Sequence, residues 1–182
     1  MNLTLTLKSF LGSAPDNETL MARFAQNGDN ALLAQLYDAC GDELYHFIKT
    51  QSDETLAKDI CQRTWLKVIE KKHLYQNSGS FKGWLYTLAR NLLIDERRKH
   101  VRLVEQYSEI PSPILAPASL EKRFDHALMR LPFEQREAFC LQQEGFGLQD
   151  IAQITHSGIE TVKSRLRYAK TALRKDLEKY HD

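Results

Sequence analysis

The sequence predicts an all-α protein: two small helical domains joined by a flexible linker, the second containing a helix-turn-helix. Apolar residues recur at helical spacing on both sides of a proline-bearing stretch, and no strand-rich segment or internal repeat is present. Near the carboxyl end, two helical patterns meet at a tight turn. We therefore divide the chain into a flexible N-terminal arm (1–16), a first domain (17–100), a linker (101–118) and a second domain (119–182).

Bulk composition describes an ordinary globular protein, with 42% hydrophobic and 27% charged residues. No run of about eighteen apolar residues is present, so no transmembrane helix is expected. Residues 1–17 lack the basic start and continuous apolar core of a signal peptide. Cys40, Cys61 and Cys140 are odd in number, far apart and not at zinc-binding spacing, which fits a reducing cytoplasm. We expect a cytoplasmic protein whose cysteines act as small buried hydrophobes.

The formal net charge of +1 conceals an uneven distribution. Residues 160–175 hold six Lys or Arg and one Glu, a net +5, and residues 82–102 hold six Lys or Arg and two acids, a net +4. The remainder of the chain must therefore carry −8. Two cationic segments on an acidic body indicate two separate contacts with a polyanion.

The first domain begins with three helical segments. The first pattern is broken at residues 27–29 by Asn-Gly-Asp, and Gly41 is expected to interrupt the second. Ser52 or Asp53 can cap a third helix, over about residues 54–72. The inward side of that helix is predicted to comprise Ala57, Ile60, Cys61, Thr64, Trp65 and Val68.

The outward side of the helix at 54–72 carries Asp59, Gln62, Arg63 and Leu66, at relative positions zero, three, four and seven. A polar face with one exposed leucine fits a solvated surface and a partner-binding surface equally well. The residues alone leave both readings open.

A polar loop at residues 74–80 precedes a basic helix over residues 81–99. Its apolar seam is predicted to be Leu85, Leu88, Ala89 and Leu92, with Lys82, Tyr86, Arg90, Asn91, Arg97 and Arg98 on other faces. Aromatic rings interleaved with cations suit unstacked bases, because rings stack on bases while cations hold the backbone. The alternative is that Phe81 and Trp84 belong to the core, and we expect this of at least one of them.

In the second domain, Ser119 can cap a helix that reaches Leu131, and Pro132 fits the first turn of a helix ending at Gly145 or Gly147. The helix-turn-helix follows. Apolar Leu148, Ile151 and Ile154 mark its first helix. Val162, Leu166, Ala169 and Leu173 form one stripe of the second, and Lys163, Arg167, Lys170 and Arg174 repeat on another face.

His156 occupies the turn between these two helices, where a left-handed backbone is expected, and His is among the residues enriched there. A basic helix by itself is more often a solvated surface helix. The preceding short helix and tight turn favour a DNA-reading helix instead, whose long cationic side chains reach phosphates and guanine edges in the major groove.

Two blocks of the sequence resemble the extracytoplasmic-function (ECF) class of bacterial RNA polymerase sigma factors. The motif GWLYTLARNLLIDERR lies in the first block and TVKSRLRYAKTALR in the second, and their co-occurrence is specific. The resemblance covers nearly all of residues 18–177. It implies a promoter-specificity subunit that catalyses nothing, binds core RNA polymerase, reads the −10 and −35 promoter elements as melted strand and duplex, and is commonly held inactive by an anti-sigma protein.

Carried over position by position, the resemblance assigns residues to each contact. The polymerase would meet Asp59, Gln62, Arg63 and Leu66. The −10 element would meet Tyr75, Lys82, Arg90, Asn91, Arg97, Arg98 and Lys99. The −35 element would meet Glu160, Thr161, Lys163, Ser164, Arg165, Arg167, Tyr168 and Lys170.

Four positions depart from the family pattern: Arg63 stands where Glu is usual, His156 replaces a turn Gly, and Gln142 and Tyr168 replace common basic residues. A conventional dimeric repressor or activator is the main alternative, because the second motif alone occurs in many regulators. An enzyme is not expected, nor is a cofactor or small-molecule substrate, because no phosphate-binding glycine loop, metal-ligand cluster or nucleophile elbow is present.

Overall fold

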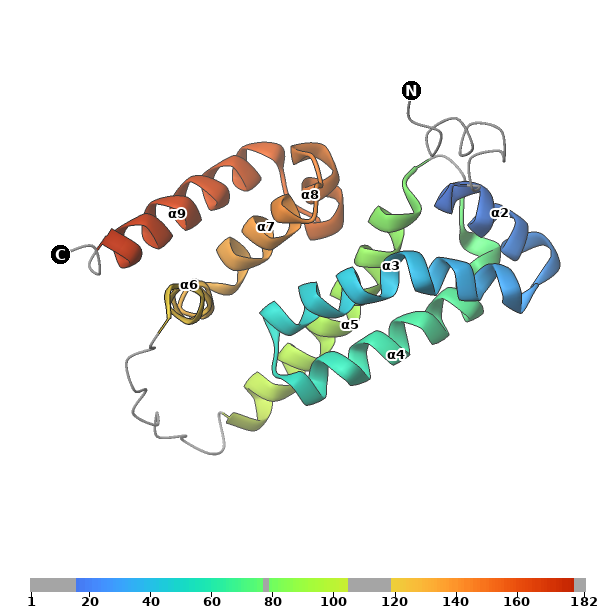
Figure 1. Ribbon diagram of the computed structural model, residues 1–182, viewed down its shortest axis with the longest axis horizontal. Coiled ribbons are helices and arrows are strands. Elements are labelled where there is room, and N and C mark those ends of the chain that lie inside the picture. Colours follow the sequence, from blue (N-terminus) through green and yellow to red (C-terminus); the bar gives the residue numbers. More distant parts are fainter. Residues whose placement is uncertain (1–15, 77–78, 105–118, 179–182) are drawn as a thin grey trace, which may run out of the picture.

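The computed structural model describes residues 16–76, 79–104 and 119–178, with the side chains of 101–104 left aside. Within these ranges the chain is helical and contains no strand, as the sequence predicts. The first half comprises α2 (Asn17–Asn27), α3 (Asn30–Gln51), α4 (Glu54–Lys71), the short 3₁₀ helix η1 (Lys72–Leu74) and α5 (Phe81–Val104). The second half comprises α6 (Leu120–Met129), α7 (Phe133–Gln143), α8 (Leu148–Thr155) and α9 (Ile159–Glu178) (Figure 1). Most of the expected N-terminal arm lies outside the described residues. All three prolines of the expected linker also lie outside them.

Side-chain caps fix where several helices begin. The carboxylates of Asp16, Asp29 and Asp53 accept hydrogen bonds from backbone N–H groups in the first turns of α2, α3 and α4. Ser119 caps α6 through Lys122 N–H at 3.3 Å, as predicted. Because the first N–H groups of a helix have no partner within it, such caps determine the starting residue.

Of the two glycines predicted to interrupt helices, Gly28 does so and Gly41 does not. Gly28 ends α2 in a left-handed conformation, with φ of 68°. Gly41, predicted to interrupt a helix, instead lies buried within the unbroken α3. A Cβ at Gly41 would sit 3.4 Å from the ring of Tyr37, one turn earlier on the same helix.

Helix α5 differs from its prediction in two ways. It continues to Val104, past the expected start of the linker. Its buried seam includes Leu93 and Tyr86, both almost fully enclosed, whereas Leu92 is only partly buried. Tyr86 was predicted on an outer face, and it is covered because helices of both halves pack around it. Phe81 is buried, as expected of at least one aromatic residue at the start of this helix.

The two halves pack directly against each other. Helix α7 contacts α3, and α8 contacts α5 (Figure 1). Buried apolar side chains from both halves belong to a single cluster. This packing brings acidic residues of α7 onto the basic helix α5.

Candidate nucleic-acid interfaces

The turn between α8 and α9 is built by local hydrogen bonds. His156 has φ of 50°, the only positive φ at a non-glycine among the described residues, and its backbone N–H bonds to Gln153 O at 3.2 Å. The buried Thr155 hydroxyl donates to Ile151 O at 2.7 Å and lies 2.7 Å from the Ser157 hydroxyl. The predicted role of His156 as a turn residue is therefore confirmed, since histidine tolerates this conformation.

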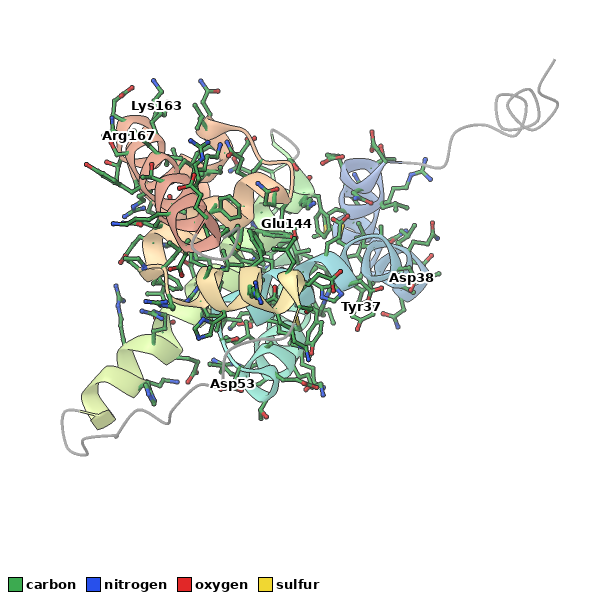
Figure 2. The ribbon with its side chains drawn as sticks, turned by 60° about the vertical axis from the view of Figure 1, so that its left-hand side comes forward. Tyr37, Asp38, Asp53, Glu144, Lys163 and Arg167 are labelled. Atoms are coloured by element: carbon green, nitrogen blue, oxygen red, sulfur yellow. The ribbon has the colours of Figure 1, made fainter. Side chains whose placement is uncertain are left out.

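The two faces of α9 are those that the sequence predicts. Val162, Leu166, Ala169 and Leu173 are buried, which anchors the helix on α7 and α8. The other face is open to solvent. Figure 2 shows Lys163 and Arg167 pointing outward from this helix. The exposed members of the predicted upstream set are Glu160, Thr161, Lys163, Arg167, Tyr168 and Lys170, while Ser164 and Arg165 are half-buried.

The cations of the outer α9 face make contacts within their own helix. Lys163 Nζ lies 2.7 Å from the Glu160 carboxylate, and the Arg167 guanidinium lies 5.1 Å from the centre of the Tyr168 ring. Arg165, by contrast, turns toward the corner and donates to the Ser157 hydroxyl at 3.4 Å. Such exposed pairs are weak and exchange readily with a phosphate.

Helix α5 presents a second cationic surface toward its carboxyl end. Asn91, Arg97, Arg98 and Lys99 are exposed. Arg98 and Lys99 pair with acids one turn away on α5, at 3.9 Å and 2.9 Å. The Arg97 guanidinium stacks 3.9 Å from the ring centre of Phe133, the first residue of α7.

An aromatic hollow lies near the start of α5. Tyr75 is half-buried and packs edge-on against Trp84, with ring centres 5.3 Å apart. Burial raises the pKa of the Tyr75 hydroxyl, which therefore stays a hydrogen-bond donor. These rings line a cavity of about 310 Å³ that Gln153 and Ile154 of α8 also line.

Arg90 and Lys82, both predicted to contact DNA, are engaged by the second half of the chain. Arg90 makes two hydrogen bonds to the Glu137 carboxylate of α7, at 2.7 and 3.2 Å. The Glu137 side chain is fully buried and that of Arg90 is 12% exposed. Burial raises the pKa of Glu137, and the adjacent Arg90 opposes that rise. Lys82 is held between Glu43 of α3, at 2.7 Å, and Glu144.

Glu137 and Glu144 are absent from the predicted site residues, although the sequence carries a signal for them. They continue the helical spacing of Phe133, Cys140 and Leu141, so they belong to the stripe of α7 that faces inward. A carboxylate in an apolar stripe requires a buried partner. The sequence does not reveal that the partner is Arg90.

The outer side of α4 carries the residues assigned to the polymerase. Asp59, Gln62 and Leu66 are exposed, the last with 63% of its surface accessible. The Arg63 guanidinium lies 2.9 Å from Asp59 and 2.8 Å from Glu96 of α5. Its charge is thus compensated locally.

A groove of about 560 Å³ lies beside these residues, between α3 and α4. Tyr37, Tyr45, Trp65, Leu66 and Ile69 line it. Tyr37, Leu66 and Ile69 are among the exposed large hydrophobic residues of the described chain. In Figure 2, Tyr37 lies on the side of the molecule away from Lys163 and Arg167.

Within the described ranges, no group of three or more His, Cys, Asp or Glu side chains is placed to hold a metal ion. The same residues include no helix long and apolar enough to cross a membrane.

Comparison with known proteins identifies both halves. Residues 36–103 match the family model Sigma-70 region 2, and residues 121–173 match Sigma-70, region 4. The ECF RNA polymerase sigma factor EcfG of Rhodopseudomonas palustris is 35% identical over 124 residues, which cover 64% of this chain and 68% of that protein. The ECF RNA polymerase sigma factor SigL of Mycobacterium tuberculosis is 32% identical over 167 residues, which cover 85% of this chain and 93% of that protein.

Solved structures agree with these matches. The sigma factor RpoE from Bartonella quintana, in complex with the anti-sigma factor NepR, is 30% identical with a TM-score of 0.70, over 80% of this chain and 96% of that one. CnrH, in complex with the cytosolic domain of CnrY, is 20% identical with a TM-score of 0.69, over 90% of this chain and 98% of that one. CnrH therefore shares the fold of this chain. The chain belongs to the ECF family of RNA polymerase sigma factors.

Proposed function

We propose that this sigma factor is a cytoplasmic promoter-specificity subunit that binds core RNA polymerase, reads a −10 and a −35 element, and catalyses no reaction itself. The observation that carries the proposal is the pairing of two exposed cationic helical surfaces, on α5 and α9, in one chain. In this reading residues 17–100 form the domain for the polymerase and the −10 element, residues 101–118 a linker, and residues 119–182 the domain for the −35 element.

Helix α9 is assigned to the duplex −35 element. A single helix fits the major groove, and its outer face would present Lys163 and Arg167 to phosphates or guanine edges. The buried stripe on the opposite face holds this surface rigidly against α7 and α8. Rigid support favours base reading, because little side-chain and backbone freedom remains to be lost on binding.

Helix α5 and the preceding loop are assigned to the melted −10 element. The hollow beside Tyr75 and Trp84 offers aromatic surfaces on which an extruded base can stack. Arg97, Arg98 and Lys99 would hold the adjacent backbone phosphates. Asn91, exposed on the same helix, supplies a polar side chain that can hydrogen-bond to a base edge.

The outer side of α4 is assigned to the polymerase. Asp59 and Gln62 provide polar contacts beside the exposed Leu66, which adjoins the apolar groove between α3 and α4. An exposed apolar patch rimmed by polar groups is typical of a protein interface. Because the similar RpoE is solved in complex with the anti-sigma factor NepR, we extend the proposal to control by an anti-sigma protein.

Run-off transcription with purified core polymerase tests the function. Candidate promoters come from sequencing the transcripts that overexpression of this chain induces. We expect initiation to require the chain, and the double variant Lys163→Ala, Arg167→Ala to lose it. The control Lys122→Ala removes an exposed cation of α6 that lies outside the assigned sites, and should retain activity. Initiation independent of the chain at every candidate promoter, or tight binding of a dimer to a palindrome without polymerase, would overturn the proposal.

A further inference from the structure

The surface assigned to the −10 element is partly covered by the chain itself. Arg90 meets Glu137 through two parallel hydrogen bonds, 47 residues apart in sequence and from opposite halves of the molecule. A carboxylate held in this fork occupies the same donors that a phosphate would use. Arg90 therefore cannot bind DNA while Glu137 is in place.

Glu144 makes a second contact of the same kind at the end of α7. Its carboxylate accepts from the Tyr86 hydroxyl at 3.0 Å, and its backbone oxygen accepts from Lys82 Nζ at 2.9 Å. Phe146 completes the contact, with its ring centre 4.9 Å from that of Tyr86. Figure 2 shows Glu144 in the middle of the molecule, between the two halves.

Two further contacts extend the covered area along α5. Phe133 stacks under Arg97, which was assigned to a backbone phosphate. Gln153 and Ile154 of α8 line the same cavity as Tyr75 and Trp84. Helices α7 and α8 thus approach Arg90, Arg97 and the aromatic hollow together.

We propose that Glu137 and Glu144 form an internal latch, which closes the second half of the chain over the −10 surface and must open before melted DNA can bind. The latch is a regulatory device at the site assigned above, and in that respect it rests on the proposed function. Binding of polymerase together with both promoter elements would supply the opening. In the closed form α9 and the carboxyl end of α5 remain exposed, while Arg90 and Lys82 are held by the second half.

The substitution Glu137→Gln tests the latch in the full-length chain. Glutamine cannot neutralise the charge of Arg90, so the substitution should destabilise the closed form. It should hardly change the stability of the open form, because residue 137 is then exposed to solvent. Glu134→Gln is the matched control: it changes the same residue type on the same helix, at an exposed position. Glu144→Gln tests the second contact, with circular dichroism used to verify that each variant is folded.

Two measurements report the result without polymerase. Small-angle X-ray scattering should give a larger radius of gyration for Glu137→Gln than for the native chain and Glu134→Gln. A fluorescein-labelled single-stranded oligonucleotide should bind at least about tenfold more tightly to Glu137→Gln, because apparent affinity scales with the open fraction. Glu144→Gln should change both quantities in the same direction by less.

Unchanged dimensions and unchanged oligonucleotide affinity in Glu137→Gln and Glu144→Gln would overturn the latch. If Glu137→Gln does not fold, Glu144→Gln alone tests the latch. An unchanged radius of gyration and unchanged oligonucleotide affinity in Glu144→Gln would then overturn the latch. These outcomes are separable from failure of the proposed function. If the native chain supports no initiation but the variants open as described, the proposed function is refuted and the latch is retained. If the native chain supports initiation but the variants do not open, the proposed function is retained and the latch is refuted.

Discussion

The two cationic helices of this molecule have similar charge but different surroundings. On α9 the positive face points to solvent, and its ion pair with Glu160 lies within the same helix. On α5 the central cation, Arg90, is bound by a fully buried carboxylate from the other half. The comparison shows that a local charge count identifies a polyanion-binding segment but says nothing of whether the charges are available. On α5, availability depends on the packing of α7.

Removal of Arg90 should have the largest effect. In Arg90→Ala, Glu137 is left buried without its cation, and breaking a buried pair costs about 3 kcal/mol or more. We expect the free energy of unfolding in urea to fall by about 3 kcal/mol. The control Arg98→Ala removes an exposed cation of the same helix and should cost less than about 0.5 kcal/mol. Equal, small losses for both variants would mean that the Arg90–Glu137 pair does not hold the two halves together.

Thiol reactivity distinguishes the cysteines of the first half, the buried Cys40 and the half-buried Cys61, from Cys140 at the interface between the halves. Burial raises the pKa of Cys40 and Cys61 to about 11, from an ordinary value of 9.0. At pH 8 their thiolate fraction is therefore lower by roughly 100-fold, and alkylation by iodoacetamide should be slowed accordingly. The rate should rise with pH, because the thiolate accumulates only as pH approaches about 11. Rapid labelling of either thiol at pH 8 would contradict the packing described for α3 and α4.

Cys140 provides the matching measurement at the interface. Burial also raises its pKa, and its sulfur lies 3.3 Å from the Thr50 hydroxyl of the opposite half. Opening of the halves exposes this thiol. We expect Glu137→Gln to accelerate the labelling of Cys140 while Cys40 and Cys61 remain slow, as peptide mass spectrometry can resolve. Equal acceleration of all three would indicate general unfolding instead.

On α9, the loss of one exposed cation should weaken promoter binding without affecting the fold. Arg167→Ala is expected to reduce affinity of the polymerase complex for the −35 element by about 1–3 kcal/mol if the native contact is bidentate to guanine. It should also lower the salt dependence of binding by about one phosphate equivalent if the contact is to the backbone. Fluorescence anisotropy over a salt series separates the two cases. An unchanged affinity and slope would remove Arg167 from the interface.

The smallest effect is expected for Glu160→Ala. The Glu160 side chain is 85% exposed, and its pair with Lys163 should contribute less than about 0.5 kcal/mol to the stability of the fold. The same change leaves Lys163 without its acid, so DNA binding should be equal or slightly tighter. A clear loss of binding, measured in the same anisotropy assay, would assign Glu160 a direct contact with a base amino group instead.

The sequence predicts what depends on neighbours in the chain. The buried stripe of α9, the left-handed His156 and the cap at Ser119 all follow from local spacing or residue chemistry. The burial of Tyr86 and the pairing of Arg90 do not, because they depend on which distant helix packs on α5. Helical periodicity identifies which face of α7 turns inward, but not what that face meets.

The continuity of α3 across Gly41 shows the same limit. Glycine lowers helix propensity by about 1 kcal/mol, which favours a break when the segment is considered alone. Packing of α3 against α2, α4 and α7 overrides that preference, and a Cβ at Gly41 would only just touch the ring of Tyr37, one turn away on the same helix. Tertiary contact therefore reverses a local prediction at this residue.

Footprinting of the polymerase complex tests most directly whether α5 and α9 act together on one promoter. The native chain with core polymerase should protect two separate promoter segments. Arg97→Ala with Arg98→Ala should weaken the downstream one alone, and Lys163→Ala with Arg167→Ala the upstream one alone. Protection of a single segment, or loss of both segments in either double variant, would contradict the division of DNA recognition between the two helices.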